Sequence, residues 1–347
     1  MGRNVRISSL GLAPGYERAA DASLWILEEM EKAAQDGADL ILTPEVWSGQ
    51  SAAPKDGGFH APVLDRAAEI AAQYHTYISV CMERYLTEAE EKATRTSLAG
   101  GFWSSAKRLK HNSQFLLDRN GEQVYIYDKL YPYPPEFNES DGAQDHFAGQ
   151  CASAVKEEAV VPGDHIGVFD CDFGRIGLAI CFDMNFPKVW EAMAGRDVEL
   201  VIWPAAFSGG RNAALRAGTY HYYVATCTSI GQGDCRAADI NGDWLMVKYP
   251  EEGRAVNRAD ISLDLDRTIF HKNYNEAGIA QIEKDYAGRV NVDRSLYYEE
   301  EWIVLSSEEK DLIRALCEEY GLVPLRQFKM HAMPEYIDAR RCETIVK

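Results

Sequence analysis

The sequence predicts an α/β fold in which short buried strands alternate with amphipathic helices. Three apolar stretches, at residues 5–10, 39–43 and 77–82, have the length and composition of buried strands. Between them, residues 17–35 carry apolar side chains at helical spacing, and residues 63–74 are expected to form a second helix. Strands that alternate with helices of this length form βα units in a largely buried sheet.

Two turn signals then predict β-hairpins. Asn120 and Gly121 form a dipeptide that is strongly preferred in tight turns, and strand-like runs lie on both sides of it. A second turn is expected near Phe173 and Gly174. The elements expected later in the chain are three strands and one helix, at residues 198–203, 223–228, 260–265 and 212–222. The regular pattern thus continues well into the second half of the chain.

Two segments interrupt this pattern. Residues 131–164 are rich in proline, glycine and acidic residues and are expected to form a long loop. Loops of this length inside a compact domain are usually functional or mobile. Near the C-terminus the pattern weakens, with one helix expected at 308–320. We therefore expect a main domain over residues 1–285 and a C-terminal extension over residues 286–347 that packs on this domain or on a partner subunit.

The composition is that of a soluble globular protein, and the charge excludes several classes of function. The 347 residues carry a formal net charge of −18, and a surface of that sign repels nucleic acids and anionic membranes. The first residues lack the apolar core of a signal peptide, and no apolar run approaches the roughly 20 residues of a membrane span. We therefore expect a cytoplasmic protein that acts on a small molecule, with no nucleic acid or membrane partner.

Neither the cysteines nor the histidines are spaced as metal ligands. The eight cysteines are scattered without a CxxC pair, and the eight histidines show no HxH or HExxH spacing. A disulfide framework is not expected in a cytoplasmic protein, so most of the cysteines are expected to be small core residues. The sequence thus predicts no metal and no cofactor.

Three polar residues follow apolar strands, at positions where an α/β sheet presents catalytic groups. Glu45 follows DLILTP, Lys129 follows VYIYD, and Cys181 follows IGLAI. Taken singly, such residues are usually a loop acid, a surface lysine and a core cysteine. An acid, an amine and a thiol at three strand ends are, however, the groups that covalent catalysis by a thiol requires.

A thiol needs help to act as a nucleophile, because its ordinary pKa of about 8.5 leaves only a few per cent as thiolate at neutral pH. A neighbouring carboxylate can take the proton, and an ammonium group can stabilise both the thiolate and the oxyanion formed on a carbonyl. Glu45 fits the first role and Lys129 the second. The backbone N–H of Phe182, at the predicted turn from strand to helix, is a further candidate donor to the oxyanion.

Several stretches resemble, in the same order, the signature motifs of the nitrilase superfamily, the carbon-nitrogen hydrolases. They are LILTPE at 40–45, YDKLYPYPPE at 127–136, PGD at 162–164 and GRIGLAICFDMNFP at 174–187. The resemblance covers about residues 3–270. It implies an αββα four-layer sandwich that dimerises through the face carrying the helix after the nucleophile, and hence a homodimer or higher homo-oligomer.

The same resemblance implies a Glu-Lys-Cys triad, which would consist of Glu45, Lys129 and Cys181. The family often adds a second glutamate shortly after the lysine, and Glu136 is the matching position, with a solvated loop acid as the alternative. The reaction implied is hydrolysis of a small amide through a thioester on Cys181, with release of ammonia or an amine.

The residues after the cysteine bear on which bond is cut. True nitrilases commonly show Trp-Glu there, whereas amide and carbamoyl hydrolases of the family favour an acid two residues on, as at Asp183. A nitrilase and an N-carbamoyl amino acid amidohydrolase remain alternatives. Relatives of the latter kind carry an arginine where this chain has Met184 and Asn185. Other arginines that could grip a substrate carboxylate, or else have surface or structural roles, are Arg175, Arg211 and Arg216.

Several aromatic residues flank the proposed site and could shape an apolar pocket, although most aromatic residues in an α/β core simply fill volume. This set contains Tyr131, Tyr133, Phe137, Trp203 and Phe207. Trp203 and Pro204 follow a strand in the register of the other catalytic ends, so Trp203 is the better candidate for a pocket wall.

Two readings of another kind stay open. A papain-like enzyme would pair Cys181 with a histidine, and His165, His221 and His271 are candidates. His221 also replaces an acid that in the family usually supports the lysine or the dimer contact. The non-enzyme alternative is a catalytically silent binding or scaffold protein on the same fold, which would be favoured if any residue of the triad were missing.

Overall fold

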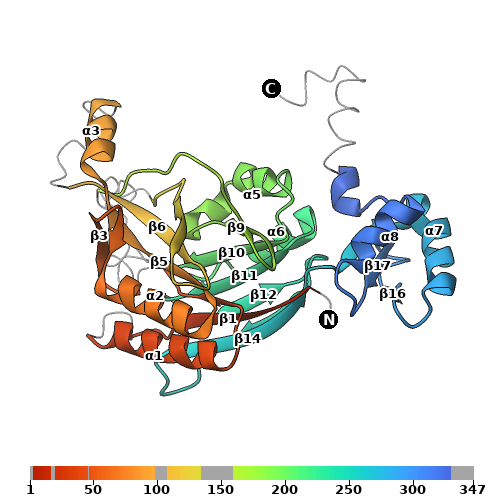
Figure 1. Cartoon of the computed structure of the whole chain (residues 1–347), viewed down its shortest axis with the longest axis horizontal. Helices are drawn as coiled ribbons and strands as arrows, with labels where there is room; N and C mark the ends of the chain where they lie inside the picture. The colour runs from red at the N-terminus through yellow and green to blue at the C-terminus, as the bar shows by residue number, and fades with distance from the viewer. Residues whose placement is uncertain (1–2, 17–19, 46, 98–107, 134–158, 330–347) are drawn as a thin grey trace, which may run out of the picture.

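The computed structural model describes residues 3–16, 20–45, 47–97, 108–133 and 159–329. Its centre is two β-sheets that lie face to face (Figure 1). In the first sheet β14, β1, β2 and β5 lie side by side, β6 and β7 continue from β5, and the short pair β3 and β4 joins the far end of β5. The bounds of these strands are β1 Asn4–Leu12, β2 Leu40–Leu42, β3 Ser51–Lys55, β4 Gly58–His60, β5 Tyr77–Tyr85, β6 Lys110–Leu117, β7 Gln123–Asp128 and β14 Val256–Asp264.

The second sheet has six strands in the order β13-β12-β11-β10-β9-β8. Their bounds are β8 Gly167–Cys171, β9 Gly174–Leu178, β10 Leu200–Ala205, β11 Tyr223–Thr228, β12 Cys235–Ala238 and β13 Trp244–Lys248. Strands β9, β10 and β11 run parallel to one another, as β1, β2 and β5 do in the first sheet. The carboxyl ends of these parallel strands are where a sheet of this kind presents polar side chains.

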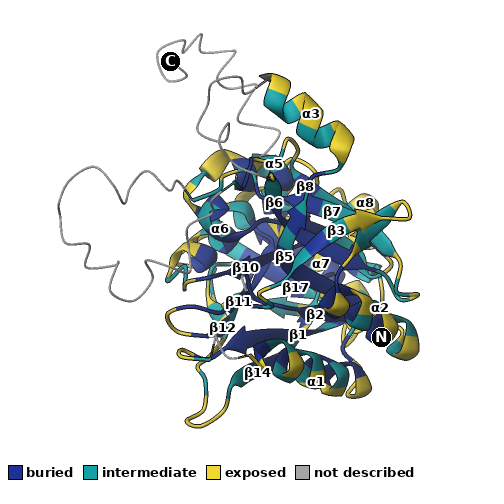
Figure 2. Ribbon diagram, turned by 90° about the vertical axis from the view of Figure 1, so that its left-hand side faces the viewer, coloured by how far each residue is buried: buried dark blue, intermediate teal, exposed yellow. Residues whose placement is uncertain are grey.

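Helices cover the outer face of each sheet. Helices α1 (Ala22–Gln35) and α2 (Pro62–Tyr74) pack on the first sheet, and α5 (Pro187–Ala194) and α6 (Asn212–Tyr220) pack on the second (Figure 1). The strands are mostly buried, whereas α1 and α3 (Glu88–Ser97) expose their outward sides (Figure 2). The predicted αββα four-layer sandwich is therefore confirmed.

The inward face of α1 shows how the sequence specifies this packing. Its buried residues include Ala22, Ile26, Met30 and Ala33, which recur every three or four positions and so lie on one side of the helix. They join the apolar cluster between this helix layer and the first sheet. A second and larger cluster fills the space between the sheets and beneath α5 and α6.

A smaller unit, called the C-terminal unit below, follows the sandwich along the chain. It consists of the antiparallel sheet β15-β17-β16 and two helices, with bounds β15 Thr268–His271, α7 Lys272–Asp285, β16 Asn291–Asp293, β17 Trp302–Ser306 and α8 Leu312–Tyr320. Its apolar core is separate and includes Phe270, Ile279 and Ile303. The third sheet thus crosses the predicted domain boundary at residue 285, because β15 lies before it and β16 and β17 lie after it. Use of the C-terminal extension in packing on a partner stays a prediction.

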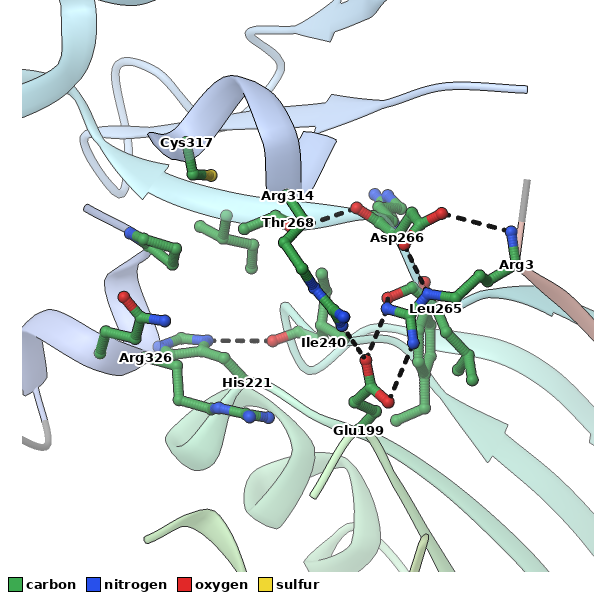
Figure 3. A pocket seen from close by; sticks show the side chains of 15 residues that line it. Arg3, Glu199, His221, Ile240, Leu265, Asp266, Thr268, Arg314, Cys317 and Arg326 are labelled. Carbon is green, nitrogen blue, oxygen red and sulfur yellow. Dashed lines mark hydrogen bonds and ion pairs between the residues drawn. The ribbon is translucent and has the colours of Figure 1, made fainter. Parts of the chain in front are cut away.

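Charged side chains hold this unit against the sandwich. Arg3 binds Glu199 and Asp266, and Arg314 of α8 lies 3.5 Å from Glu199 (Figure 3). These four residues line a cavity of about 180 Å³, and His221 lines it as well. Arg3 is mostly buried and donates several hydrogen bonds to the two carboxylates, whereas Arg314 is largely exposed. Such arginine–carboxylate pairs fix orientation, and here they link the C-terminal unit to the edge of the sandwich.

Most predicted elements are present, with shifted ends. The helix expected over 17–35 is described from Ala22, and the strand expected over 260–265 begins already at Val256, because it pairs with all of β1. Both predicted hairpins are confirmed. The hairpin of β12 and β13 was missed, although Asn241 and Gly242 carry the same turn signal.

Candidate active site

The three residues singled out at strand ends meet between the two sheets. Glu45 comes three residues after β2, Lys129 directly follows β7, and Cys181 opens the short 3₁₀ helix η3 (Cys181–Asn185) that follows β9. Strands β2 and β7 belong to the first sheet and β9 to the second. All three side chains are almost fully buried, with Lys129 exposed by only 1%.

The Glu45 carboxylate is held by three hydrogen-bond donors. Lys129 Nζ lies 2.8 Å from Oε1, and Asn112 Nδ2 donates to the same oxygen at 2.7 Å. The backbone N–H of Ala206 donates to Oε2 at 2.7 Å. Buried carboxylates are stable only when paired and hydrogen-bonded in this way, so Glu45 has a fixed position and orientation.

The Cys181 thiol is hydrogen-bonded to the Glu45 carboxylate and also accepts from the backbone N–H of Ala206. Burial raises the pKa of this thiol well above its usual value, and the charge of Glu45 adds to the rise, whereas Lys129 opposes it. The resting site therefore holds a protonated thiol next to a carboxylate that can accept its proton.

The backbone at Cys181 is in an uncommon conformation. Its φ is +44°, in the left-handed region that side chains other than glycine rarely adopt. The chain passes here from a β conformation at Ile180 straight into η3, and Trp203 Nε1 donates to the Cys181 carbonyl oxygen at 3.0 Å. A sharp strand-to-helix turn of this kind turns the thiol toward Glu45 and away from the strand.

A chain of charged groups supports the lysine from its N-terminal side. Asp128 precedes Lys129 and accepts two hydrogen bonds from the guanidinium of Arg84, at 2.9 and 2.7 Å. Arg84 in turn binds Glu90, and Asp128 also accepts from Ser113. These contacts lower the pKa of Asp128, so it stays ionised and fixes the backbone from which Lys129 extends.

Asp183 connects the nucleophile turn to the lysine strand. Its carboxylate accepts from the Tyr127 hydroxyl at 2.8 Å, from the Tyr131 backbone N–H at 2.9 Å and from the Ile180 backbone N–H at 2.9 Å. Tyr127 and Tyr131 flank Lys129 in sequence, and Ile180 precedes Cys181. Asp183 is thus a positioning residue that sets the spacing between the two chemically active segments.

We expect the stability contribution of Asp183 to depend on pH. Burial raises the pKa of its carboxyl to about 6, although its hydrogen bonds and Lys129 favour the charged form. In the unfolded chain the pKa is about 3.9, so between these values only the folded protein keeps the proton, and stability falls as pH rises. Relative to Asp183→Asn, the wild-type free energy of unfolding should fall by about 1 kcal/mol from pH 5 to pH 7.5 in chemical denaturation. Parallel pH profiles of the two proteins would contradict this.

The predicted substrate-binding residues lie near the nucleophile turn. Phe182 follows Cys181 and packs edge-on against Tyr133, at 5.2 Å between ring centroids. Trp203 is buried beneath the turn through its hydrogen bond to Cys181, and Pro204 lies next to it in β10. Glu136, together with Phe137, lies outside the described residues. The substrate-binding role of these residues stays a prediction.

The arginines proposed as carboxylate-binding groups have structural contacts. Arg175 pairs with Asp170, and Arg211 is exposed before α6. Arg216 donates to the Met184 carbonyl oxygen at 3.0 Å and lies over the ring of Trp190. The structural alternative therefore fits each of the three.

The candidate histidines lie in other environments. His165 pairs with the exposed Asp164, and His271 caps the N-terminus of α7. His221 contacts the Ile240 carbonyl oxygen and lies 2.7 Å from Lys329 Nζ, in the cavity of Figure 3. The geometry at Cys181 thus favours Glu45 over a histidine as the proton acceptor.

Sequence reasoning missed Asn112, which orients Glu45. A signal was present, because HNSQFLL places two amides, Asn112 and Gln114, at alternating positions of an otherwise buried strand. Gln114 donates to the Ala179 carbonyl oxygen at 2.8 Å, just before the nucleophile turn. Amides at every second position of a strand lie on the same face of the sheet, and here that face borders the candidate active site.

Most of the other cysteines in the described residues are small core residues, as predicted, and Cys151 and Cys342 lie outside the described residues. Within the described ranges the free thiols are Cys81, Cys171, Cys181, Cys227, Cys235 and Cys317, and all but Cys317 are buried. In the same ranges no cluster of three or more His, Cys, Asp or Glu side chains is arranged to hold a metal ion. No helix of the described part is both long enough and apolar enough to cross a membrane.

Two curated relatives are amidases by name. The chloroplastic omega-amidase of Arabidopsis thaliana is 27% identical over 271 residues, which cover 72% of this chain and 66% of the relative. The deaminated glutathione amidase of Yersinia enterocolitica is 24% identical over 212 residues, which cover 59% of this chain and 64% of the relative. The matched part is thus just under two thirds of each relative's own length.

A solved structure and a family model complete the comparison. An amidase from Nesterenkonia sp. shares the fold, with a TM-score of 0.52 at 19% identity over 81% of this chain and 96% of that chain. A mutant of that amidase carries the acetamide moiety of fluoroacetamide covalently bound at its active-site cysteine. The carbon-nitrogen hydrolase family model matches residues 6–269. Because this match spans most of the chain, the protein belongs to the carbon-nitrogen hydrolases of the nitrilase superfamily and is a hydrolase of carbon–nitrogen bonds other than peptide bonds.

Proposed function

We propose that the protein is an amidase that hydrolyses a small amide through a thioester on Cys181. The observation that carries this proposal is the buried contact of three groups, in which Glu45 is bound at once by Lys129 and by the Cys181 thiol. A base, a cation and a nucleophile within hydrogen-bond reach are the minimum set for acyl transfer by a thiol. The amidases named above support amide hydrolysis, and the adduct on one of them supports a cysteine as the nucleophile.

In the first half of the reaction, Glu45 takes the thiol proton as the sulfur attacks the amide carbon. The C=O π bond opens, and its oxygen becomes an oxyanion that Lys129 and the backbone N–H of Phe182 stabilise. When the intermediate collapses, the C–N bond breaks and Glu45 returns the proton to the leaving nitrogen. Ammonia or an amine departs, and a thioester to Cys181 remains.

In the second half, a water molecule enters where the amine has left. Glu45 removes one proton as the water oxygen attacks the thioester carbon, and the same donors stabilise the new oxyanion. Collapse then breaks the C–S bond, and the thiolate takes the proton back from Glu45. The products are a carboxylic acid and the original enzyme, with atoms and charge balanced. Glu136 as a further catalytic residue, a homo-oligomeric assembly and a cytoplasmic location stay predictions.

The proposal predicts that Glu45→Gln loses turnover by about 100- to 10,000-fold, because the amide side chain cannot take the thiol proton. Ammonia release from acetamide would be measured for both proteins. Glu31→Gln, in a surface ion pair with Arg66, is the matched control and should keep wild-type rates. Full turnover by Glu45→Gln would exclude the glutamate as the base.

Intact-mass measurement tests the covalent step and separates an enzyme from a scaffold. After mixing with acetamide, the wild-type protein should gain the mass of an acetyl group as ammonia leaves. With fluoroacetamide, whose fluoride the thiolate can displace, it should gain the mass of a CH2–CO–NH2 group. Peptide mapping should place either group on Cys181. Complete absence of an adduct, together with no ammonia release from any amide tried, would favour a catalytically silent binding protein.

A further inference from the structure

The segment of residues 206–210 leads from β10 towards α6 and carries one of the groups that hold the active site. The Ala206 backbone N–H donates to Glu45 Oε2 at 2.7 Å and to the Cys181 thiol. The register of β10 with β11 ends one residue before it, at Ala205. The position of the Ala206 N–H therefore depends on what holds the chain beyond the end of the strand.

Asp234 holds this segment through its side chain. It directly precedes β12 and is fully buried. Its carboxylate accepts from Thr228 Oγ1, at the end of β11, at 2.8 Å and from Ser208 Oγ at 3.3 Å. Ser208 Oγ itself accepts from the Gly210 backbone N–H at 3.2 Å. The carboxylate thus links the end of β11 to the segment that follows β10.

Arg236, the second residue of β12, fixes the same carboxylate and the same segment. Its Nε donates to Asp234 Oδ2, the oxygen that Ser208 also reaches. Its Nη1 lies 3.5 Å from the Gly210 carbonyl oxygen, and its guanidinium lies over the ring of Trp244. A buried carboxylate is stable only when it is paired in this way. The ion pair therefore holds the segment at two points, the Ser208 hydroxyl and the Gly210 backbone.

The other side of the segment lies against Trp203. A Cβ added at Gly209 would lie 2.7 Å from the ring of Trp203, so the backbone of the segment rests directly on that ring. Trp203 Nε1 in turn donates to the Cys181 carbonyl oxygen. The segment is thus held between the Asp234 carboxylate and a ring that is bound to the nucleophile residue.

We propose that Asp234 is a positioning residue for the reaction, because through Ser208 it sets where the Ala206 N–H lies. That N–H in turn fixes the Glu45 carboxylate and the Cys181 thiol relative to each other. This inference rests on the proposed amidase reaction and adds to it a residue that acts through others rather than by contact with the reacting atoms. Reaction rates depend steeply on such placement, because a misplacement of about 1 Å can cost about 100-fold.

The alternative is a role in stability alone, since Asp234 and Arg236 form a buried ion pair. Asp266 and Arg3 provide the matched control, because their burial is nearly the same. The two carboxylate side chains are both 1% exposed, and the two arginine side chains are 12% and 11% exposed. Asp266 belongs to the junction with the C-terminal unit rather than to the segment after β10. Asp266→Ala should therefore lower the melting temperature, as Asp234→Ala does, but keep the wild-type kcat.

Ammonia release from acetamide would give kcat and KM for each variant. Asp234→Ala should lower kcat by about 10- to 100-fold and change KM by less than about threefold, because placement of the reacting groups matters more to the chemical step than to binding. Ser208→Ala should lower kcat in the same direction. Combining both changes should slow the reaction no further than Asp234→Ala alone, because the carboxylate acts through that hydroxyl. A wild-type kcat in Asp234→Ala, or equal losses of kcat in Asp234→Ala and Asp266→Ala, would overturn the proposal.

Alkylation of Cys181 by iodoacetamide tests the same placement without turnover. The Ala206 N–H lowers the pKa of the thiol, because it donates to the charged form. In Asp234→Ala this pKa should rise, so at pH 8 iodoacetamide should alkylate Cys181 about three- to tenfold more slowly than in the wild type. Peptide mapping would follow the thiol, and Asp266→Ala should react at the wild-type rate. Equal alkylation rates in Asp234→Ala and the wild type would mean that Asp234 does not place the N–H.

The positioning role and the amidase reaction fail separately in these measurements. If the wild type releases no ammonia and forms no adduct with any amide tried, the reaction is wrong, and alkylation still decides whether Asp234 places the N–H. If the wild type turns over and Asp234→Ala matches it in kcat and in alkylation, the positioning role alone is wrong.

Discussion

Replacing Cys181 by serine is expected to lower kcat by at least about 1,000-fold and to abolish the covalent adduct. A hydroxyl has a far higher pKa than a thiol, so Glu45 cannot take its proton as the oxygen attacks. The side chain is otherwise similar in size and remains within reach of Glu45 and the Ala206 N–H. Turnover would be followed by ammonia release, and the adduct by intact mass.

The matched control is Cys317→Ser in α8. This thiol is partly buried in the core of the C-terminal unit, far from the nucleophile turn. We expect wild-type turnover and the wild-type adduct. Circular dichroism and thermal melting should show that both variants are folded. A Cys181→Ser protein that still turns over amides at the wild-type rate would remove the thiol from the mechanism.

Replacing Lys129 by methionine is expected to affect activity and stability together. Loss of the ammonium should lower kcat by about 100- to 1,000-fold, the usual cost of removing one donor to an oxyanion. It also leaves the Glu45 carboxylate buried without its cation, which should cost about 3–5 kcal/mol in the free energy of unfolding. The latter would be measured by urea denaturation and the former by ammonia release.

A double variant separates these two effects. Glu45→Gln combined with Lys129→Met removes both charges, so no unpaired charge remains buried. We expect most of the lost stability to return, because replacing a whole buried ion pair is often nearly neutral. Activity should stay absent. A double variant as unstable as Lys129→Met alone would show that the ammonium stabilises the fold through other contacts than Glu45.

Local sequence patterns predicted many of the strands and helices of the sandwich, and the three polar residues at strand ends. Apolar runs predicted strands such as β2 and β11, and the helical spacing of α1 was visible without any structure. The ends were less certain, since β14 extends to Val256 only because β1 offers partners along its whole length. Strand ends depend on the neighbour strand, which lies more than 240 residues away in this case.

The residues that sequence reasoning did not assign act through long-range contacts. Asn112 binds Glu45 across 67 positions, and the Ala206 N–H reaches the same carboxylate across 161 positions. A backbone N–H carries no mark in the sequence, because every residue except proline has one. Asp183 was noted for its spacing from Cys181, but its bonds to Tyr127 and Tyr131 became visible only in the folded chain.

By itself the sequence determined the α/β class, many of the strands of the sandwich and the chemical groups available at their ends, because these follow from periodicity and residue type over a few positions. Only the tertiary structure showed that Glu45, Lys129 and Cys181 are buried together. It also showed that Arg216 donates to the Met184 carbonyl oxygen. The physical reason is that hydrophobic burial packs the two sheets face to face. Only this packing fixes which polar groups, distant in sequence, are buried next to one another.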